Sequence, residues 1–505
     1  MSDSTIARWD IFEHDIKADV SGNPYLDTEF WGVFSQNNRE IRVPGFYDGD
    51  GVFKVRFSPD QTGNWTLTTV SETAALNGHT ASFTVTEARD GVHGPVHVKN
   101  KFHFAHADGK PFLPFTTTCY VWTHQPLEVQ EETYKSLECE AFNKMRMCVF
   151  PKHYPYNENQ PLHDVYEVDA SGKYDPDKPN FEAFRHFEDQ IERLGEMGIE
   201  ADVIIFHPYD RWGHCTWNEE QDFRYLRYLV ARIAAYRNVW WSLANEYDFL
   251  LDLKPMERWD RFFQIIEEGD PYRHPKSIHQ GNPDNCYDHR KPWVDHVSIQ
   301  HFDIYRTPAW RADYGKPIVN DELHYEGNIP QHWGSALAET IVHRFWMTVT
   351  RGGYAGHGET YQHPEDLLWW AKGGKLHGQS PERIAFMRRI LEEDAENGIT
   401  PFEELDDQRP FKSIGAGIDG DVTYVYLGDH RPATLSRGLP LEDGDWDVDI
   451  IDTWNMTVTP AKKIPSVIDV AIKHAHVTIG GKPVSAFSIE LPSKPWLCVR
   501  VRPTK

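Results

Sequence analysis

Val239-Trp-Trp-Ser-Leu-Ala-Asn-Glu-Tyr247 is a continuous apolar run that ends abruptly in an amide and a carboxyl side chain, Asn245 and Glu246. An apolar run without polar alternation is typical of a parallel strand that is buried on both faces. Lys316-Pro-Ile-Val-Asn-Asp-Glu322 is a second such run, and it too ends in a carboxylate. α/β barrels hold their chemistry where the strands end. The two runs therefore predict a barrel with Glu246 and Glu322 on one face.

Residues 93–399 contain further apolar runs that alternate with longer amphipathic segments, which is typical of βα units and a parallel sheet. The candidate strands are residues 112–118, 144–150, 201–207, 239–246, 276–280, 296–301, 318–322 and 353–358. They predict a closed (β/α)8 barrel, or TIM barrel. We expect it to be irregular after residues 276 and 296, because the segments that follow are too short for long helices. Residues 1–92 and 400–505 carry short runs between Gly, Asp and Pro turns, and each region is predicted to be a β-sandwich.

The composition excludes some partners. The formal charge of −25 repels polyphosphates and anionic lipids, so we expect neither nucleic acid nor a membrane surface as a partner. The 18 Trp and 22 Tyr suit a sugar-binding cleft, although core packing accounts for such rings equally well. The sequence leaves open whether the chain works alone or as a homo-oligomer.

The amino terminus has no basic segment followed by an apolar one, and no apolar run approaches the length of a membrane span. These features predict a cytoplasmic protein. The six cysteines show neither CxxC pairs nor zinc-site spacing, so reduced thiols are expected rather than disulfides or a metal site.

Two glutamates at strand ends fit the chemistry of glycoside cleavage. That reaction needs one carboxylic acid to protonate the departing oxygen and one carboxylate to attack the anomeric carbon or activate water. We assign Glu246 as the acid/base, because burial would keep it protonated, and Glu322 as the nucleophile, which needs a nearby cation. Arg146, in the middle of a predicted strand, is the candidate cation; the alternative is an ion pair with a different acid.

A set of residues at successive strand ends resembles the clan A glycoside hydrolases, the retaining cellulase-like barrels. The members of the set are Arg146, His207, Asn245, Glu246, His301 and Glu322. Residues 316–327 are similar to the nucleophile segment of apiosidase-like glycosidases. The resemblance implies a retaining O-glycosidase without a cofactor, and a sandwich on each side of the barrel. It also implies that Asn245 binds the sugar 2-hydroxyl, while Arg146 and His207 support the carboxylates or the sugar.

The chain departs from the cellulase pattern in two places. Asp303 stands where a tyrosine is expected after His301, and Gly356-His-Gly-Glu-Thr-Tyr361 replaces a tryptophan platform. Both changes favour an unusual sugar over cellulose. His301 and Asp303 are candidate sugar contacts, and further candidates near the strand ends are Tyr120, Trp122, Tyr325, His357 and Glu359. Glu326 is interpreted as holding a loop or binding a hydroxyl.

A long segment at residues 151–180 follows the second strand and is rich in His, Tyr, Asn, Asp and Pro. Long loops in compact domains are usually functional or disordered, and the aromatic residues favour a lid over one end of the cleft. A cleft with a blocked end predicts exo action on short oligosaccharides or plant-type glycosides.

Two other functions stay open. A metal-dependent barrel hydrolase is suggested by His207, His279, His301 and His357 near strand ends, but no His-x-His closes the first strand to begin a metal cluster. A non-catalytic carbohydrate-binding protein is the other alternative, and in that case replacing either glutamate would leave the function unharmed.

Overall fold

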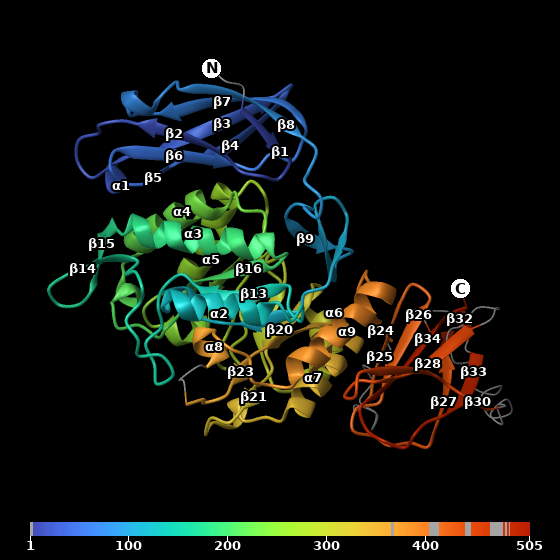
Figure 1. Ribbon diagram of the computed structural model, residues 1–505. Coiled ribbons are helices and arrows are strands. Elements are labelled where there is room, and N and C mark those ends of the chain that lie inside the picture. Colours follow the sequence, from blue (N-terminus) through green and yellow to red (C-terminus); the bar gives the residue numbers. More distant parts are fainter. Residues whose placement is uncertain are drawn as a thin grey trace.

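The computed structural model describes residues 4–364, 368–402, 414–439, 446–464, 478–479, 482–483 and 485–504. Its centre is an eight-stranded parallel sheet built around the run that begins at Val239 (Figure 1). The strands in chain order are β12 (Thr116–Thr118), β13 (Lys144–Cys148), β16 (Glu200–Phe206), β17 (Val239–Ala244), β18 (Lys276–Ser277), β19 (Val297–Gln300), β20 (Ile318–Glu322) and β22 (Tyr354–His357). Every residue of β17 is buried, as its composition predicts.

The first and last strands pair with each other, since Thr116 lies opposite Gly356. Among the described residues no ladder joins β18 to β19, and side-chain hydrogen bonds bridge them instead: Ser277 Oγ donates to the His296 carbonyl (2.6 Å) and accepts from Ser298 N–H (3.1 Å). The barrel is therefore closed at one seam by backbone pairing and irregular at the other. The irregularity falls where the short connections predict it.

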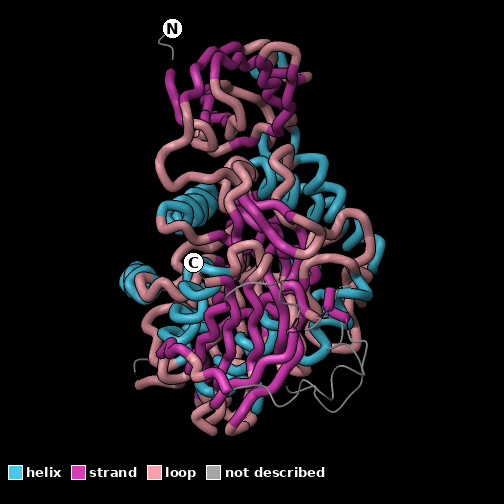
Figure 2. The backbone as a smooth tube through the Cα atoms, turned by 90° about the vertical axis from the view of Figure 1, so that its right-hand side faces the viewer, coloured by secondary structure: helices cyan, strands magenta, loops and turns pink. Residues whose placement is uncertain are grey.

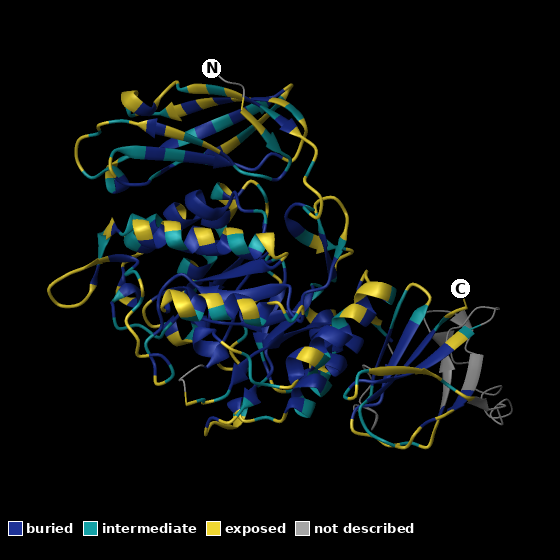
Figure 3. Cartoon of the chain, viewed as in Figure 1, coloured by how far each residue is buried: buried dark blue, intermediate teal, exposed yellow. Residues whose placement is uncertain are grey.

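The helices cover the outside of the barrel. They are α2 (Leu127–Leu137), α3 (Phe181–Glu196), α4 (Glu219–Ile233), α5 (Met256–Gly269), α6 (Thr307–Tyr314), α7 (Ala338–Thr350), α9 (Ser380–Asp394) and the single turn α8 (Trp369–Lys372). The single turn α1 (Pro24–Asp27) belongs to the N-terminal region (Figure 1). In α3, Asn180 caps the first turn, and Phe184, Phe187, Ile191 and Leu194 form the buried stripe. Figure 3 shows the resulting contrast between buried strands and exposed outer helix faces.

One predicted strand is interrupted. Residues 112–118 form two short strands, β11 (Pro111–Phe112) and β12, with Pro114 between them. Proline has no backbone N–H to donate to a ladder, so the strand is interrupted there. β11 belongs instead to a small antiparallel sheet with β9 (Val96–Lys99) and β10 (His103–His106), and Phe104 of that sheet contacts Trp240 of the barrel.

The N-terminal region is a β-sandwich. One sheet contains β1 (Ser4–Ala7), β3 (Phe30–Gln36), β4 (Arg39–Pro44), β7 (Gly63–Ser71) and β8 (Thr80–Thr86), and the other β2 (Phe12–Lys17), β5 (Phe46–Tyr47) and β6 (Val52–Phe57). Figure 2 shows it as a separate body at the top of the molecule. Buried ion pairs join it to the barrel helices: Arg232 contacts Asp48 (2.8 Å) and Glu188, and Glu188 also contacts Arg56 (2.9 Å).

The C-terminal region is also made of two stacked sheets. The larger contains β24 (Thr400–Pro401), β25 (Gly415–Asp419), β26 (Val422–Tyr426), β28 (Trp446–Asp452), β29 (Thr457–Pro460) and β34 (Leu497–Pro503), and the smaller β27 (Thr434–Leu439), β30 (Lys463–Ile464) and β33 (Ser485–Glu490). β31 (Thr478–Ile479) and β32 (Lys482–Pro483) form a separate pair. Leu435 and Ile489 of the smaller sheet share a buried cluster with Val425 and Val499 of the larger.

The predicted fold class is therefore confirmed, while the domain boundaries at residues 92 and 399 stay predictions. Every helix in the described part of the chain is too short or too polar to traverse a bilayer. All six cysteines lie in described segments, and each has a free thiol.

Candidate active site

A cavity of about 460 Å³ opens at the carboxyl ends of the barrel strands, and Glu246 and Glu322 both line it. The other lining residues are Tyr120, Lys152, Tyr154, Pro155, Tyr156, Tyr209, Pro283, Gln300, His301, Phe302, His324, Tyr325, His332, Trp333 and Trp370. Its volume is in the range of about 300–1,000 Å³ that is usual for small-molecule sites. The two glutamates are brought together because β17 and β20 end at the same face.

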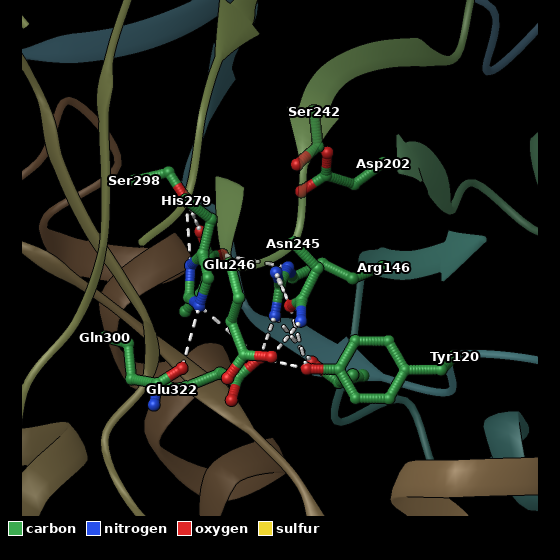
Figure 4. A network of polar contacts seen from close by, with 12 residues as sticks. Tyr120, Arg146, Asp202, Ser242, Asn245, Glu246, His279, Ser298, Gln300 and Glu322 are labelled. Atoms are coloured by element: carbon green, nitrogen blue, oxygen red, sulfur yellow. Dashed lines mark hydrogen bonds and ion pairs between the residues drawn. The ribbon is translucent and has the colours of Figure 1, made fainter. Parts of the chain in front are cut away.

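Glu322 ends β20 and lies in a cationic environment (Figure 4). Arg146 Nη1 donates to its Oε1 at 2.9 Å, Tyr120 O–H donates to the same oxygen, and His279 Nε2 lies 3.5 Å away. Burial raises the pKa of Glu322, but the charges of His279 and Arg146 and the Tyr120 hydrogen bond outweigh it and lower the pKa to about 2. Burial lowers the pKa of His279 itself to about 4, so Arg146 is the cation at neutral pH. Glu322 is therefore ionised.

Glu246 lies in a different environment. Burial, followed by the negative charge of Glu322, raises the pKa of Glu246 to about 7. Its Oε2 accepts hydrogen bonds from Tyr209 O–H and from Asn245 Nδ2 (3.1 Å). Glu246 also has left-handed backbone geometry, with φ 58° and ψ 52°, which is rare for a residue with a side chain and is concentrated at functional sites. The raised pKa thus keeps Glu246 protonated to higher pH than an ordinary glutamate.

Asn245 connects the two carboxylates. Its Oδ1 accepts from Arg146 Nη2 (3.0 Å) and lies 3.0 Å from the Tyr120 hydroxyl, whose single proton it shares with Glu322 Oε1, while its Nδ2 donates to Glu246. Arg146 and Tyr120 also donate to Glu322, so a continuous hydrogen-bonded network holds the pair in place (Figure 4).

Replacing Arg146 by Met should destabilise the protein, because it leaves Glu322 buried without its cation. Breaking one side of a buried ion pair costs about 3–5 kcal/mol, and we expect a loss of that size in the free energy of unfolding. Urea denaturation followed by tryptophan fluorescence measures it. Arg146→Lys, which keeps the charge, should lose less. Equal stability of the wild type and Arg146→Met would show that this ion pair does not stabilise the barrel.

Several of the predicted sugar contacts lie elsewhere. Trp122 is fully buried against Tyr134, and His357 is fully buried too, where its ring stacks on Phe142 (4.7 Å between ring centroids) and hydrogen-bonds Thr117. Asp303 accepts from the N–H of Tyr305 in the short helix η5 (Ile304–Arg306). The structure does not bring these side chains to the cavity wall, whereas His301, Tyr325 and Tyr120 do line it.

His207 also lies behind the wall. Its Nε2 donates to the Phe150 carbonyl (3.1 Å), and its Nδ1 accepts from the N–H of Tyr209 (3.2 Å). His207 thereby supports the loop that presents Tyr209 to Glu246, rather than a ligand in the cavity.

Glu359 and Glu326 hold backbone. They lie side by side on the paired strands β21 (Glu326–Gly327) and β23 (Glu359–Thr360). Glu359 accepts from the N–H groups of His377 (2.5 Å) and Gly378 (2.9 Å). Glu326 accepts from the N–H groups of Gln379 (2.8 Å) and Ser380 (3.0 Å), so it caps α9. This geometry matches the loop-holding interpretation of Glu326 and gives Glu359 the same role.

The sequence reasoning missed several residues of the cavity wall. Lys152, Tyr154 and Tyr156 come from the long segment after β13, and Tyr209 comes two residues after His207. The sequence pattern suggests His279 only as a metal ligand. The tyrosines of residues 151–156 indicate that this segment could line a sugar site. The sequence position of Tyr209 or His279 does not indicate a contact with Glu246 or Glu322.

One group of potential metal ligands occurs in the described part of the chain: Asp210, His214 and Cys215, whose ligand atoms lie within 4.8 Å of one another. Asp210 already accepts from the N–H groups of Trp212 (2.6 Å), Gly213 (2.9 Å) and Cys215 (2.9 Å). Burial raises the pKa of the Cys215 thiol, which donates to the His207 carbonyl (3.0 Å). A thiol held protonated and an occupied carboxylate are poor ligands, so this group is better explained as the support of the loop after β16.

Comparison with known proteins identifies the family. A model described as "Apiosidase-like, catalytic domain" matches residues 98–391, and models of two domains of unknown function match residues 5–72 and 412–502. A protein from Bacteroides vulgatus ATCC 8482, described as a putative glycoside hydrolase, has a crystal structure that is 33% identical; the match covers 99% of this chain and 100% of that chain, with a TM-score of 0.89. No match was found among curated proteins.

More distant structures share the fold alone. A glycoside hydrolase family 5 protein from Bacteroides vulgatus ATCC 8482 is 15% identical over 81% of this chain and 94% of its own, with a TM-score of 0.58. A further glycoside hydrolase is 13% identical over 82% of this chain and 97% of its own, with a TM-score of 0.61. With these matches and the cavity described above, the chain belongs to the apiosidase-like family of glycoside hydrolases with a clan A-type barrel.

Proposed function

We propose that this protein is a retaining glycosidase in which Glu322 is the nucleophile and Glu246 the acid/base. The observation that carries the proposal is that two carboxylates line one cavity in unlike surroundings: Arg146 and Tyr120 donate to Glu322 and favour its ionised form, whereas burial and the charge of Glu322 raise the pKa of Glu246. Pairs of titratable groups with such divergent environments are the usual basis of acid and nucleophile assignments.

The first step forms a covalent glycosyl-enzyme. Glu322 attacks the anomeric carbon while Glu246 gives its proton to the departing oxygen, so the bond to the aglycone breaks as the ester bond forms. The ester is neutral, which removes the negative charge that raises the pKa of Glu246. Glu246 then takes a proton from water, which hydrolyses the ester and releases the sugar with its original anomeric configuration.

We further propose exo action, on the basis of the aromatic wall. Tyr156 from the segment after β13 hydrogen-bonds Gln331 from the loop after β20, and its ring lies 5.6 Å from that of Trp370. The segments that carry Tyr156, Gln331 and Trp370 thus meet beside the cavity. This arrangement favours a cavity that is closed at one end. Release of single terminal sugars from an end-labelled oligosaccharide supports this reading, and release of mixed internal fragments would contradict it.

A screen of aryl glycosides tests the function. It should cover hexoses, pentoses and deoxysugars in both anomers, and we expect turnover of at least one member that persists in EDTA. Loss of that turnover in EDTA with rescue by zinc or manganese would favour a metal-dependent hydrolase instead.

The pH profile should report Glu246. We expect kcat/KM to fall above about pH 7, because Glu246 must start protonated. The hydrogen bond from Tyr209 stabilises the ionised form of Glu246 and so lowers its pKa; Tyr209→Phe should therefore move the alkaline limb to higher pH. Tyr154→Phe is the matched control, since the Tyr154 hydroxyl has no hydrogen-bond partner among the described residues. An alkaline limb that stays in place, or moves down, in Tyr209→Phe would contradict the assignment.

A further inference from the structure

Lys152 is a buried cation on the wall of the catalytic cavity. Its side chain is 1% exposed, and it is the one lysine or arginine among the described residues that line this cavity. Its ammonium nitrogen lies 3.4 Å from the ring centroid of Tyr120, 4.2 Å from that of Tyr209 and 5.1 Å from that of Tyr154, all of which line the same cavity. Burial lowers the pKa of Lys152, whereas the three electron-rich ring faces favour its charged form.

The ammonium group has no polar partner in the protein. Throughout the described segments, no hydrogen bond is made by Lys152 Nζ and no carboxylate oxygen lies within 4.0 Å of it. The catalytic carboxylates have other donors: Arg146 and Tyr120 serve Glu322, while Tyr209 and Asn245 serve Glu246. Ring faces attract a cation, but they accept none of its three N–H donors in the way that an oxygen does.

A buried charge without an acceptor is costly, so such groups are normally paired. Here the space next to the unpaired group is the cavity itself. The charges of Glu246 and Glu322 act on Lys152 only from beyond 4.0 Å. A hydroxyl would accept one hydrogen bond, whereas a carboxylate would supply two acceptor oxygens and the opposite charge at hydrogen-bond distance.

We propose that Lys152 binds the carboxylate of an acidic sugar, so that the substrate of this enzyme carries a uronic acid at or beside the scissile bond. This inference rests on the proposed glycosidase function of the same cavity, but it concerns binding and is testable without turnover.

The test is isothermal titration calorimetry of the full chain with methyl glucuronides and methyl galacturonides in both anomers, each paired with its neutral methyl ester. Salt of about 0.1 M limits the long-range effect of the net charge. We expect at least one acid to bind about 10- to 100-fold more tightly than its ester, which is the effect of a hydrogen bond to a charged group.

Lys152→Met and Lys152→Gln should both reduce that preference to about twofold or less, because neither carries the charge. Circular dichroism shows whether each variant is folded, and Lys178→Met, which removes a largely exposed lysine of β15 (Tyr174–Pro179), should keep the wild-type preference.

Equal binding of every acid and its ester, or no binding of any acid, would overturn the proposal. So would folded variants that weaken acid and ester alike, which would make Lys152 a positioning residue for Tyr120 and Tyr209. Failure of the glycosidase proposal is distinguishable, because it would appear as an absence of Glu322-dependent chemistry while the preference for acids in binding persisted.

Discussion

Glu322→Ala should lower kcat by about 10⁴-fold or more, because removal of a nucleophile eliminates the covalent route. Azide should restore turnover. Truncation leaves space beside Arg146 and Tyr120, where a small anion replaces the lost carboxylate charge. Azide then attacks the anomeric carbon from the side that Glu322 occupied, and the product is a glycosyl azide of inverted configuration. Initial rates with an aryl glycoside and NMR of the product measure both effects.

The control for this experiment is Glu359→Ala. Glu359 is also a buried carboxylate near the barrel rim, but it holds backbone N–H groups and does not line the cavity. Azide should not change the rate of this variant. If azide failed to rescue Glu322→Ala, or rescued both variants alike, Glu322 would not be the nucleophile.

The loss of activity in Glu246→Ala should depend on the leaving group of the substrate. For an unactivated alkyl or sugar leaving group we expect kcat/KM to fall by about 10²–10⁴-fold, the usual contribution of a general acid. For a dinitrophenyl glycoside the first step needs no acid, so kcat/KM should change by less than about tenfold. The second step still lacks its base, so the glycosyl-enzyme should accumulate and give a burst of dinitrophenolate.

Stopped-flow absorbance detects that burst, and azide should release the trapped sugar as a glycosyl azide of retained configuration. A uniform loss of activity across all leaving groups would show that Glu246 does not act as the acid. Glu326→Ala, which removes a carboxylate that caps α9, provides a comparison in which any loss should be independent of the leaving group.

The barrel and the meeting of Glu246 and Glu322 in one cavity could be predicted because both follow from periodicity. Buried parallel strands produce unbroken apolar runs, and their ends share one face, so Glu246 and Glu322 could be assigned to one site without knowledge of any loop. Arg146 was found in the same way, because a charge in mid-strand requires a buried partner.

The sugar contacts were harder to predict because a strand end does not state which way its side chain points. His357 is predicted from its position on β22, yet its ring is buried against Phe142 and does not line the cavity. Trp122 follows β12 in a short helical turn, and its side chain is likewise fully buried. Tyr209 and Lys152 reach the cavity only through loop conformations that depend on tertiary contacts such as those of His207, and these have no periodic signature.

The most direct test of the paired-carboxylate mechanism is the configuration of the first-formed sugar. An aryl glycoside that the enzyme accepts is mixed with protein in the NMR tube, and the anomeric proton of the product is followed before mutarotation proceeds. Double displacement through Glu322 and Glu246 predicts that the product first appears with the same anomeric configuration as the substrate. First appearance of the opposite anomer would mean a single displacement by water and would contradict the nucleophilic role of Glu322.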